Sequence, residues 1–184
     1  FDIKGLDRLI TALAVLKSEL PNEKFKLLVV GKGTVGKYKG LAARLDIADR
    51  VIFTGVLEKA KLDKAYLASD IFSILSRFDT FGMVVLEAMA ASLPVIVSSN
   101  VGAKDIVREG VNGFIINEED TAKISGKIAL LLDRERRLSM GREAHATALA
   151  CTWEKRAKSV EDIYETAIGK GLKIPLPPPL QRGK

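Results

Sequence analysis

The sequence predicts an α/β fold in which a parallel sheet is flanked by helices on both faces. Short, nearly all-apolar segments alternate along the chain with longer segments that have helical periodicity. Strands that are buried on both faces give continuous apolar runs, and strands that alternate with helices pair in parallel. With 184 residues, of which 47% are hydrophobic, the chain can form one domain with a sizeable core.

The elements follow one another in a regular order. The first predicted helix, residues 7–20, places Leu9, Leu13 and Leu16 on one face and ends before Pro21. The other predicted helices cover residues 37–45, 59–68, 81–92, 119–132, 135–149 and 153–168, with a short one near Ala103, and the predicted strands cover residues 24–30, 50–55, 70–76, 94–99 and 113–116. We expect one domain over residues 1–168 and a Pro-rich, extended or disordered tail over residues 169–184.

Composition narrows the possible classes of function. The net charge of +6 suits nucleic acid, an anionic membrane surface or phosphate ligands, but no aromatic-interleaved basic run typical of RNA-binding proteins is present. The single cysteine, Cys151, excludes an internal disulfide and fits a reducing cytosol. No apolar stretch is long enough for a membrane span. The sequence starts at Phe1 rather than Met, and we expect that further chain precedes it.

A glycine-rich loop follows the second predicted element. In "LLVVGKGTVGKYKG", residues 27–40, Gly31, Gly33 and Gly36 match the letters of a dinucleotide fingerprint. That fingerprint also needs an acidic residue at the end of the next strand, where this chain has Thr54 and Gly55. An NAD or FAD site is therefore not expected. The glycines either let backbone amides approach an anion or form a tight turn that needs a positive φ.

A lone acid marks the most informative stretch, "RFDTFGMVVLEAMAASLPVIVSS", residues 77–99. Glu87 is the only ionisable side chain between residues 81 and 97, so its helix is expected to be buried. A carboxylate there is either satisfied by a core partner or directed at ligand hydroxyls. Gly82 at the helix start favours a phosphate, and Asp79 precedes Glu87 by eight positions. An anion site flanked by two acids predicts a sugar-nucleotide ligand.

These motifs resemble the carboxyl-terminal, donor-binding half of a family-4-type retaining glycosyltransferase, one Rossmann-like half of a GT-B two-domain enzyme. The resemblance covers residues 1–168. It rests on the ordered blocks "KGLDRLITAL", "KLLVVGKG", "RVIFTGVL", "LASDIFSILSRFDTFGMVVLEAMAASLPVIVS" and "GVNGFII". The family signature is Glu-x7-Glu. Here Glu87 in "LEAMA" matches the second acid, and Asp79 stands in place of the first.

The resemblance also implies roles for individual residues. The catalytic set would be Lys4, which neutralises the diphosphate, Asp79 beside the donor sugar and Glu87 on the ribose. Nucleotide or diphosphate contacts would come from Gly31, Gly33, Gly55, Val56, Leu57, Phe81, Gly82, Met83 and Val84. Helix amides and Lys4 would stabilise the leaving diphosphate, so neither a metal nor a cofactor is expected besides a UDP-linked or similar donor.

The implied parent enzyme transfers a sugar with retention of anomeric configuration, in bacterial lipopolysaccharide, capsule or glycolipid synthesis. We expect it in the cytoplasm or at the inner face of the cytoplasmic membrane. Membrane contact would come through a missing amino-terminal, acceptor-binding half, without which this chain would bind nucleotide-sugar but not catalyse. Two alternatives stay open: a non-catalytic, basic nucleic-acid-binding domain, and another enzyme on the same scaffold, such as a phosphorylase or an epimerase.

Overall fold

The computed structural model describes residues 1–117 and 119–169 of the chain. Within that range the chain forms two compact units, Phe1–Leu149 and a second that begins at Ala150. The predicted Pro-rich tail, apart from its first residue at position 169, lies outside the described residues.

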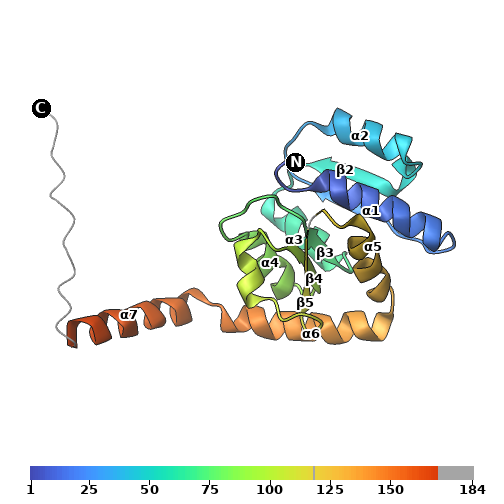
Figure 1. Ribbon diagram of the computed structural model, residues 1–184. Helices are drawn as coiled ribbons and strands as arrows, with labels where there is room; N and C mark the ends of the chain where they lie inside the picture. The colour runs from blue at the N-terminus through green and yellow to red at the C-terminus, as the bar shows by residue number, and fades with distance from the viewer. Residues whose placement is uncertain (118, 170–184) are drawn as a thin grey trace, which may run out of the picture. The chain divides into compact units, whose positions relative to one another are not determined.

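Helices and strands alternate along the first unit, as the sequence predicts (Figure 1). The strands are β1 (Leu27–Val30), β2 (Val51–Gly55), β3 (Phe72–Ile74), β4 (Val95–Ser98) and β5 (Gly113–Ile116). The helices are α1 (Leu6–Glu19), α2 (Val35–Arg44), α3 (Lys59–Leu67), α4 (Met83–Ala90), α5 (Thr121–Leu130) and α6 (Arg134–Ala150), with short 3₁₀ helices η1 (Ala48–Arg50) and η2 (Gly102–Ile106). The second unit contains α7 (Trp153–Gly169).

The strands are all parallel but belong to two hydrogen-bonded sheets. One sheet pairs β1 with β2, and the other has the order β3-β4-β5. In the second sheet Val95 of β4 faces Phe72 of β3 on one side and Gly113 of β5 on the other. Because the strands are parallel, their carboxyl ends lie at the same end of each sheet. The loops that follow these strand ends include most of the residues that the sequence nominates.

The core is formed by apolar side chains from both sheets and from the helices that cover them. The sequence spacing of α1 buries Leu6, Leu9, Ile10, Leu13 and Leu16, and this face packs against α5, which lies beside α1 in Figure 1. One buried cluster includes side chains from both sheets, and all four residues of β4 are buried. A continuous apolar core therefore holds together two sheets that share no ladder.

The first residues of the chain lie against the ends of both sheets. The ring of Phe1 packs on Gly33 beyond β1, whereas the carbonyl of Ile3 accepts a hydrogen bond of 2.8 Å from the amide of Arg77 beyond β3. Gly5 has a φ of 68°, and a Cβ there would lie 2.0 Å from the carbonyl oxygen of Leu75. Only glycine fits that position, so residues 1–5 form a close-fitting strap between the two sheets.

Candidate functional site

Lys4, Asp79 and Gly82 come together at the carboxyl end of β3. Lys4 Nζ lies 2.5 Å from Asp79 Oδ2, and the Asp79 side chain is only 13% exposed. A Cβ on Gly82 would lie 3.6 Å from the carboxyl carbon of Asp79, so this carboxylate lies next to the start of α4. The N-terminus of a helix attracts negative charge. Here that charge is supplied by Asp79, with Lys4 as its counter-ion.

The loop that carries Asp79 is pinned by backbone hydrogen bonds to the loop before η2. The Asp79 amide donates to Asn100, the Gly102 amide donates back to the Asp79 carbonyl at 3.0 Å, and the Ala103 amide donates to Phe81 at 2.7 Å. A Cβ on Gly102 would lie 2.0 Å from the carbonyl oxygen of Thr80. The close packing of these two backbones therefore fixes where Asp79 and the start of α4 lie.

Gly82 sets the beginning of α4. Its φ of 85° is left-handed, so the helix starts at Met83 and not at residue 81 as the sequence predicts. The first intrahelical bond runs from the amide of Val85 to the carbonyl of Gly82. The geometry of a helix leaves its first amides without intrahelical acceptors, and Met83 is about half exposed. The predicted diphosphate-binding backbone thus lies at the start of α4, next to the Asp79 carboxylate.

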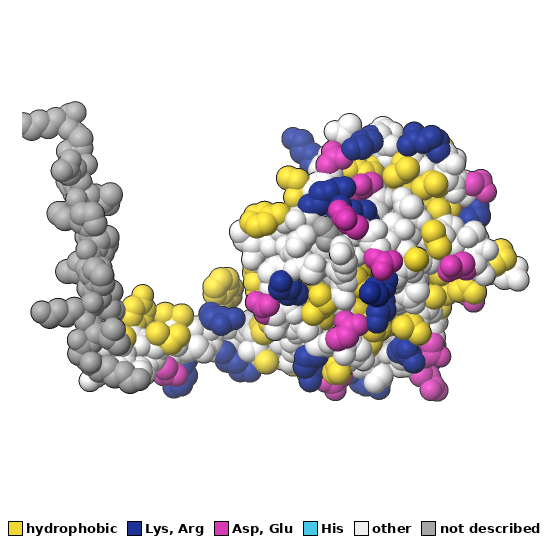
Figure 2. Space-filling model, viewed as in Figure 1, with side chains coloured by type: hydrophobic (Ala, Val, Ile, Leu, Met, Phe, Trp, Pro, Cys, Tyr) yellow, Lys and Arg dark blue, Asp and Glu magenta, His cyan; other side chains and the backbone are white. Residues whose placement is uncertain are grey.

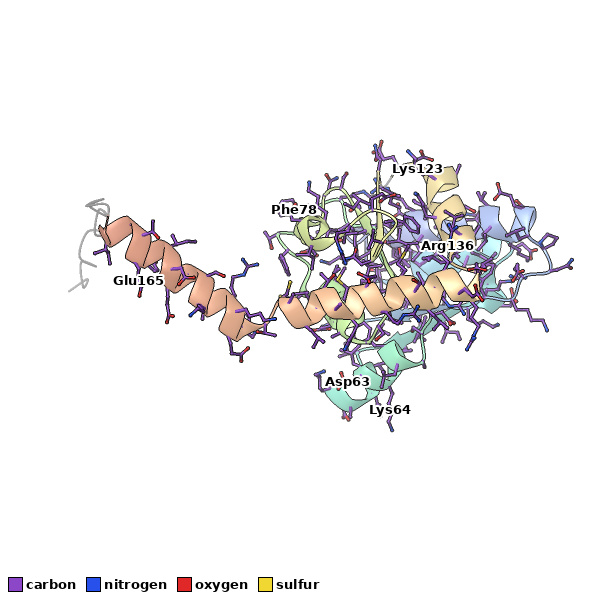
Figure 3. All side chains as sticks on the ribbon, turned by 90° about the horizontal axis from the view of Figure 1, so that it is seen from below. Asp63, Lys64, Phe78, Lys123, Arg136 and Glu165 are labelled. Atoms are coloured by element: carbon purple, nitrogen blue, oxygen red, sulfur yellow. The ribbon has the colours of Figure 1, made fainter. Side chains whose placement is uncertain are left out.

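A hollow of about 540 Å³ adjoins this terminus. It is lined by Arg77, Phe78, Asp79, Thr80, Ser99, Asn100, Val101, Gly102 and Lys104. Phe78, labelled in Figure 3, is 68% exposed on the loop before α4. The two cations at the wall have partners, since Lys104 Nζ donates to the Ser99 carbonyl and Arg77 pairs with Asp7 at 2.9 Å. The wall of the hollow therefore includes the Asp79 carboxylate and polar backbone groups at the carboxyl end of the sheet.

The glycine loop after β1 takes a different form. Gly31 has a φ of 129°, and its amide donates to the carbonyl of Gly55 at 2.8 Å, so the chain turns there as a positive-φ turn. A Cβ on Gly33 would lie 2.3 Å from the ring of Phe1. That ring packs edge-on against Tyr38 with centroids 5.8 Å apart. The close approach that Gly33 permits is therefore made by the Phe1 side chain of the same protein.

Residues 55–57 extend from the end of β2, beside Gly31. Gly55 is left-handed with a φ of 73°, and no atom lies within 4 Å of a Cβ placed on it. Val56 is 74% exposed, whereas Leu57 is half-buried. An exposed apolar side chain at the carboxyl edge of a strand leaves a surface on which a flat ring can pack.

Buried and charged groups fasten the strap of residues 1–5 to the glycine loop and α2. Asp2 Oδ1 accepts a hydrogen bond of 2.7 Å from the hydroxyl of Tyr38 and contacts Lys37. Lys37 and then Tyr38 lower the pKa of Asp2, while burial, followed by the hydrogen bond to Asp2, raises the pKa of Tyr38. Lys4 is therefore carried by a segment that is held at both of its sides.

Glu87 is exposed, so the prediction of a buried carboxylate is wrong. The buried face of α4 is formed by Val85, Ala88 and Met89, and Glu87 lies off that face. Its Oε2 accepts a hydrogen bond of 2.9 Å from the hydroxyl of Tyr66 on α3. Among the described residues no contact joins Glu87 to the Lys4–Asp79 pair, so the structure places the two signature acids in separate surroundings on the same helix–loop element.

Sequence reasoning missed several residues at this edge. Tyr66 holds Glu87, Arg77 ties the loop to Asp7, and Phe1 covers the glycine loop. No spacing rule links Tyr66 to a carboxylate 21 positions later. The only histidine, His145, lies on α6, with its Nδ1 2.8 Å from the carbonyl of Ala90 at the end of α4, and thus helps to position that helix.

The described part of the chain lacks two other features. There, no group of three or more His, Cys, Asp or Glu side chains is arranged to hold a metal ion. None of the helices that the structure describes is both long and apolar enough to cross a bilayer. On the face shown in Figure 2, lysines and arginines are interspersed with acidic side chains and form no continuous basic stripe.

Comparison with known proteins gives a consistent result. The family model of the glycosyl transferases group 1 matches residues 1–147. The chain is 30% identical over 177 residues to a D-inositol 3-phosphate glycosyltransferase of Acidothermus cellulolyticus, covering 91% of this chain and 39% of that protein. It thus spans about two fifths of the length of this curated relative.

Two solved structures share the fold. An Anabaena protein, HepE, solved in complex with UDP-glucose, superposes with a TM-score of 0.75 at 25% identity, over 92% of this chain and 46% of that one. The C-terminal domain of a Francisella tularensis protein of the same group superposes with a TM-score of 0.73 at 23% identity, over 82% and 80% of the two chains. The predicted α/β fold, one Rossmann-like half of the GT-B architecture, is confirmed.

Proposed function

Because the chain belongs to the group 1 family of glycosyl transferases, we propose that it forms the donor-binding part of a retaining glycosyltransferase and binds a UDP-sugar. The observation that supports this most directly is the Lys4–Asp79 pair beside the N-terminus of α4. It combines a cation, helix amides and a carboxylate at the carboxyl end of a parallel strand. Ligands in open α/β sheets bind at that end.

Each part of the donor has a candidate partner in this arrangement. The amides of residues 82–84 and Lys4 would bind the diphosphate, and Asp79 at the 540 Å³ hollow would accept hydrogen bonds from the sugar. Residues 55–57 would support the base, and Glu87 would accept the ribose hydroxyls. A UDP-glucose complex of a protein with the same fold supports this choice of nucleotide.

The same proposal covers the reaction and its setting. Lys4 and the dipole of α4 would stabilise the charge that develops on the departing diphosphate, so we expect no metal requirement. Catalysis would need an acceptor-binding part outside this chain, which alone would bind donor without transferring its sugar. Synthesis of lipopolysaccharide, capsule or glycolipid at the inner face of the cytoplasmic membrane is the setting we propose.

Titration calorimetry on the 184-residue chain tests the assignment. UDP, UDP-glucose, UDP-N-acetylglucosamine, GDP-mannose and inorganic pyrophosphate would be compared, with and without a chelator. Lys4→Met should weaken every diphosphate roughly tenfold, as loss of a charge-assisted contact does. Lys123→Met is the matched control, because its side chain is 61% exposed against 52% for Lys4 and it lies on α5 (Figure 3).

Glu87→Gln separates the nucleoside from the diphosphate. It should weaken UDP and leave pyrophosphate unchanged, because only UDP carries ribose hydroxyls. Equal binding of UDP by the wild type and by both variants would remove these residues from the site. Strongly salt-dependent binding to any RNA or DNA, unaffected by Glu87→Gln, would instead support a nucleic-acid-binding domain.

A further inference from the structure

The hydrogen bond between Tyr66 and Glu87 connects the helix after the proposed base segment to the proposed ribose acid. Tyr66 Oη donates to Glu87 Oε2 at 2.9 Å. The tyrosine ring is half-buried and lies 6.1 Å, centroid to centroid, from the ring of Phe72 at the start of β3. Its ring is held by packing, while its hydroxyl reaches a carboxylate that is exposed to solvent.

Two charged side chains of α3, Lys59 and Asp63, lie near this bond. Lys59, Asp63 and Tyr66 recur at helical spacing on α3, and Asp63, labelled in Figure 3, pairs with Lys59. Burial, then the hydrogen bond to Glu87, and then the charges of Glu87 and Asp63 raise the pKa of Tyr66. This shift acts in the same direction as the geometry, in which the protonated phenol donates to Glu87.

We propose that Tyr66 is a positioning residue that holds the Glu87 carboxylate ready for the two ribose hydroxyls of the nucleotide. This inference rests on the proposed function. An exposed glutamate samples several rotamers, and a ligand that needs one of them loses affinity through that ordering. Tyr66 bonds one carboxylate oxygen, Oε2, and leaves Oε1 to accept from the ligand.

The position of α3 gives this bond a second consequence. α3 begins at Lys59, one residue after the segment 55–57, and Tyr66 lies in its last turn. The same rigid helix therefore links the end of β2, where the base would lie, to Glu87 on α4. The orientation of the carboxylate is set by the element that follows the base segment.

Tyr66→Phe tests the positioning role, because it removes only the hydroxyl. UDP and 2′,3′-dideoxyuridine 5′-diphosphate would be titrated into the 184-residue chain by calorimetry. The variant should bind UDP roughly fivefold more weakly, because the nucleotide must then itself order the exposed Glu87 carboxylate. Its affinity for the dideoxy nucleotide should stay within about twofold of wild type. Tyr164→Phe, a tyrosine of the second unit, is the matched control.

Combining the change with Glu87→Ala shows whether Tyr66 acts through Glu87. In the Glu87→Ala background, Tyr66→Phe should have no further effect on UDP, since the two residues would act as one unit. An equal loss of affinity for both nucleotides, or an effect that persists without Glu87, would show that Tyr66 only packs. Unchanged binding of UDP to Tyr66→Phe, with Glu87→Ala still weakened, would overturn this inference alone, whereas a wild-type chain that binds no UDP would overturn the proposed function and this inference with it.

Discussion

Lys4 and Asp79 form an ion pair of 2.5 Å that lies beside the first residues of α4, 75 positions apart in sequence. The Lys4 side chain is half exposed, whereas Asp79 is nearly buried. The carboxylate therefore lies beside the positive end of the helix and engages the cation that we propose for the diphosphate. Asp79 and a bound phosphate would therefore compete for Lys4 and for the N-terminus of α4.

Asp79→Asn should therefore tighten the binding of UDP. Removing the carboxylate frees Lys4 and removes a negative charge beside the phosphates, an effect we expect to be about fivefold at a partly exposed site. The additional affinity for UDP-glucose over UDP should fall, since the asparagine is a weaker acceptor for sugar hydroxyls. Calorimetry with both ligands measures the two effects, with Asp162→Asn on α7 as the charge-matched control. Weaker binding of UDP would show that Asp79 orients Lys4 instead.

Gly102→Ala should destabilise the first unit. The new Cβ would lie 2.0 Å from the carbonyl oxygen of Thr80, so one of two pinned backbones must move. Overpacking against backbone lowers the free energy of unfolding by about 2 kcal/mol. Gly126→Ala on α5, where a Cβ meets nothing within 4 Å, should raise it by up to about 1 kcal/mol. Urea unfolding monitored by circular dichroism compares the two, and equal stability would contradict the tight packing at Gly102.

Asn112→Ala should remove a buried polar network between the turn before β5 and α6. The fully buried Asn112 accepts from the amide of Arg108 at 2.7 Å and donates to the Ile106 carbonyl and to Thr147. Losing these bonds leaves buried groups unpaired and lowers the free energy of unfolding by about 3 kcal/mol. The exposed Asn22→Ala should change it by less than about 0.5 kcal/mol. Thermal unfolding of both variants supplies the check.

The Asp7–Arg77 pair predicts a loss of stability in acid. Burial raises the pKa of Asp7, but the hydrogen bond and charge of Arg77 lower it more, so its pKa lies below 3.8. A carboxyl with a depressed folded-state pKa stabilises the fold above its unfolded pKa, and that contribution is lost as pH falls through the folded value. Urea unfolding from about pH 6 down to about pH 3 should show this loss in wild type. Both Asp7→Asn and Arg77→Met should flatten the profile in that window, and identical profiles for all three proteins would exclude the pair as its source.

Much of the fold was predictable because apolar runs and helical spacing report burial directly. The segments that became β2, β4 and β5 are nearly all apolar, and α1 keeps its leucines on one face. The same spacing argument, applied to α4, would have shown that Glu87 lies off the face of Val85, Ala88 and Met89. Counting apolar residues in the run, rather than placing them around the helix, led to the wrong prediction of burial.

The rest depends on contacts between distant segments. The Lys4–Asp79 pair joins the strap to the β3–α4 loop, and the bond from Tyr66 to Glu87 joins two helices. In each of these pairs, the sequence around one residue does not show which distant residue will contact it. The role of Gly33 also depends on a distant residue, Phe1. The Phe1 ring fills the space beside Gly33, which a dinucleotide-binding fingerprint would leave for a phosphate. Local patterns nominated the residues of the candidate site, but only the packed chain shows which of their side chains meet.

The division of the strands into β1–β2 and β3–β4–β5 gives the first unit an internal seam crossed by side chains and not by a backbone ladder. We expect the amide protons of β1 and β2 to exchange with solvent faster than those of the fully buried β4. A nucleotide that contacts residues 55–57 and α4 together would span the seam and act as a brace. Ligand binding would then slow amide exchange on both sides of the seam.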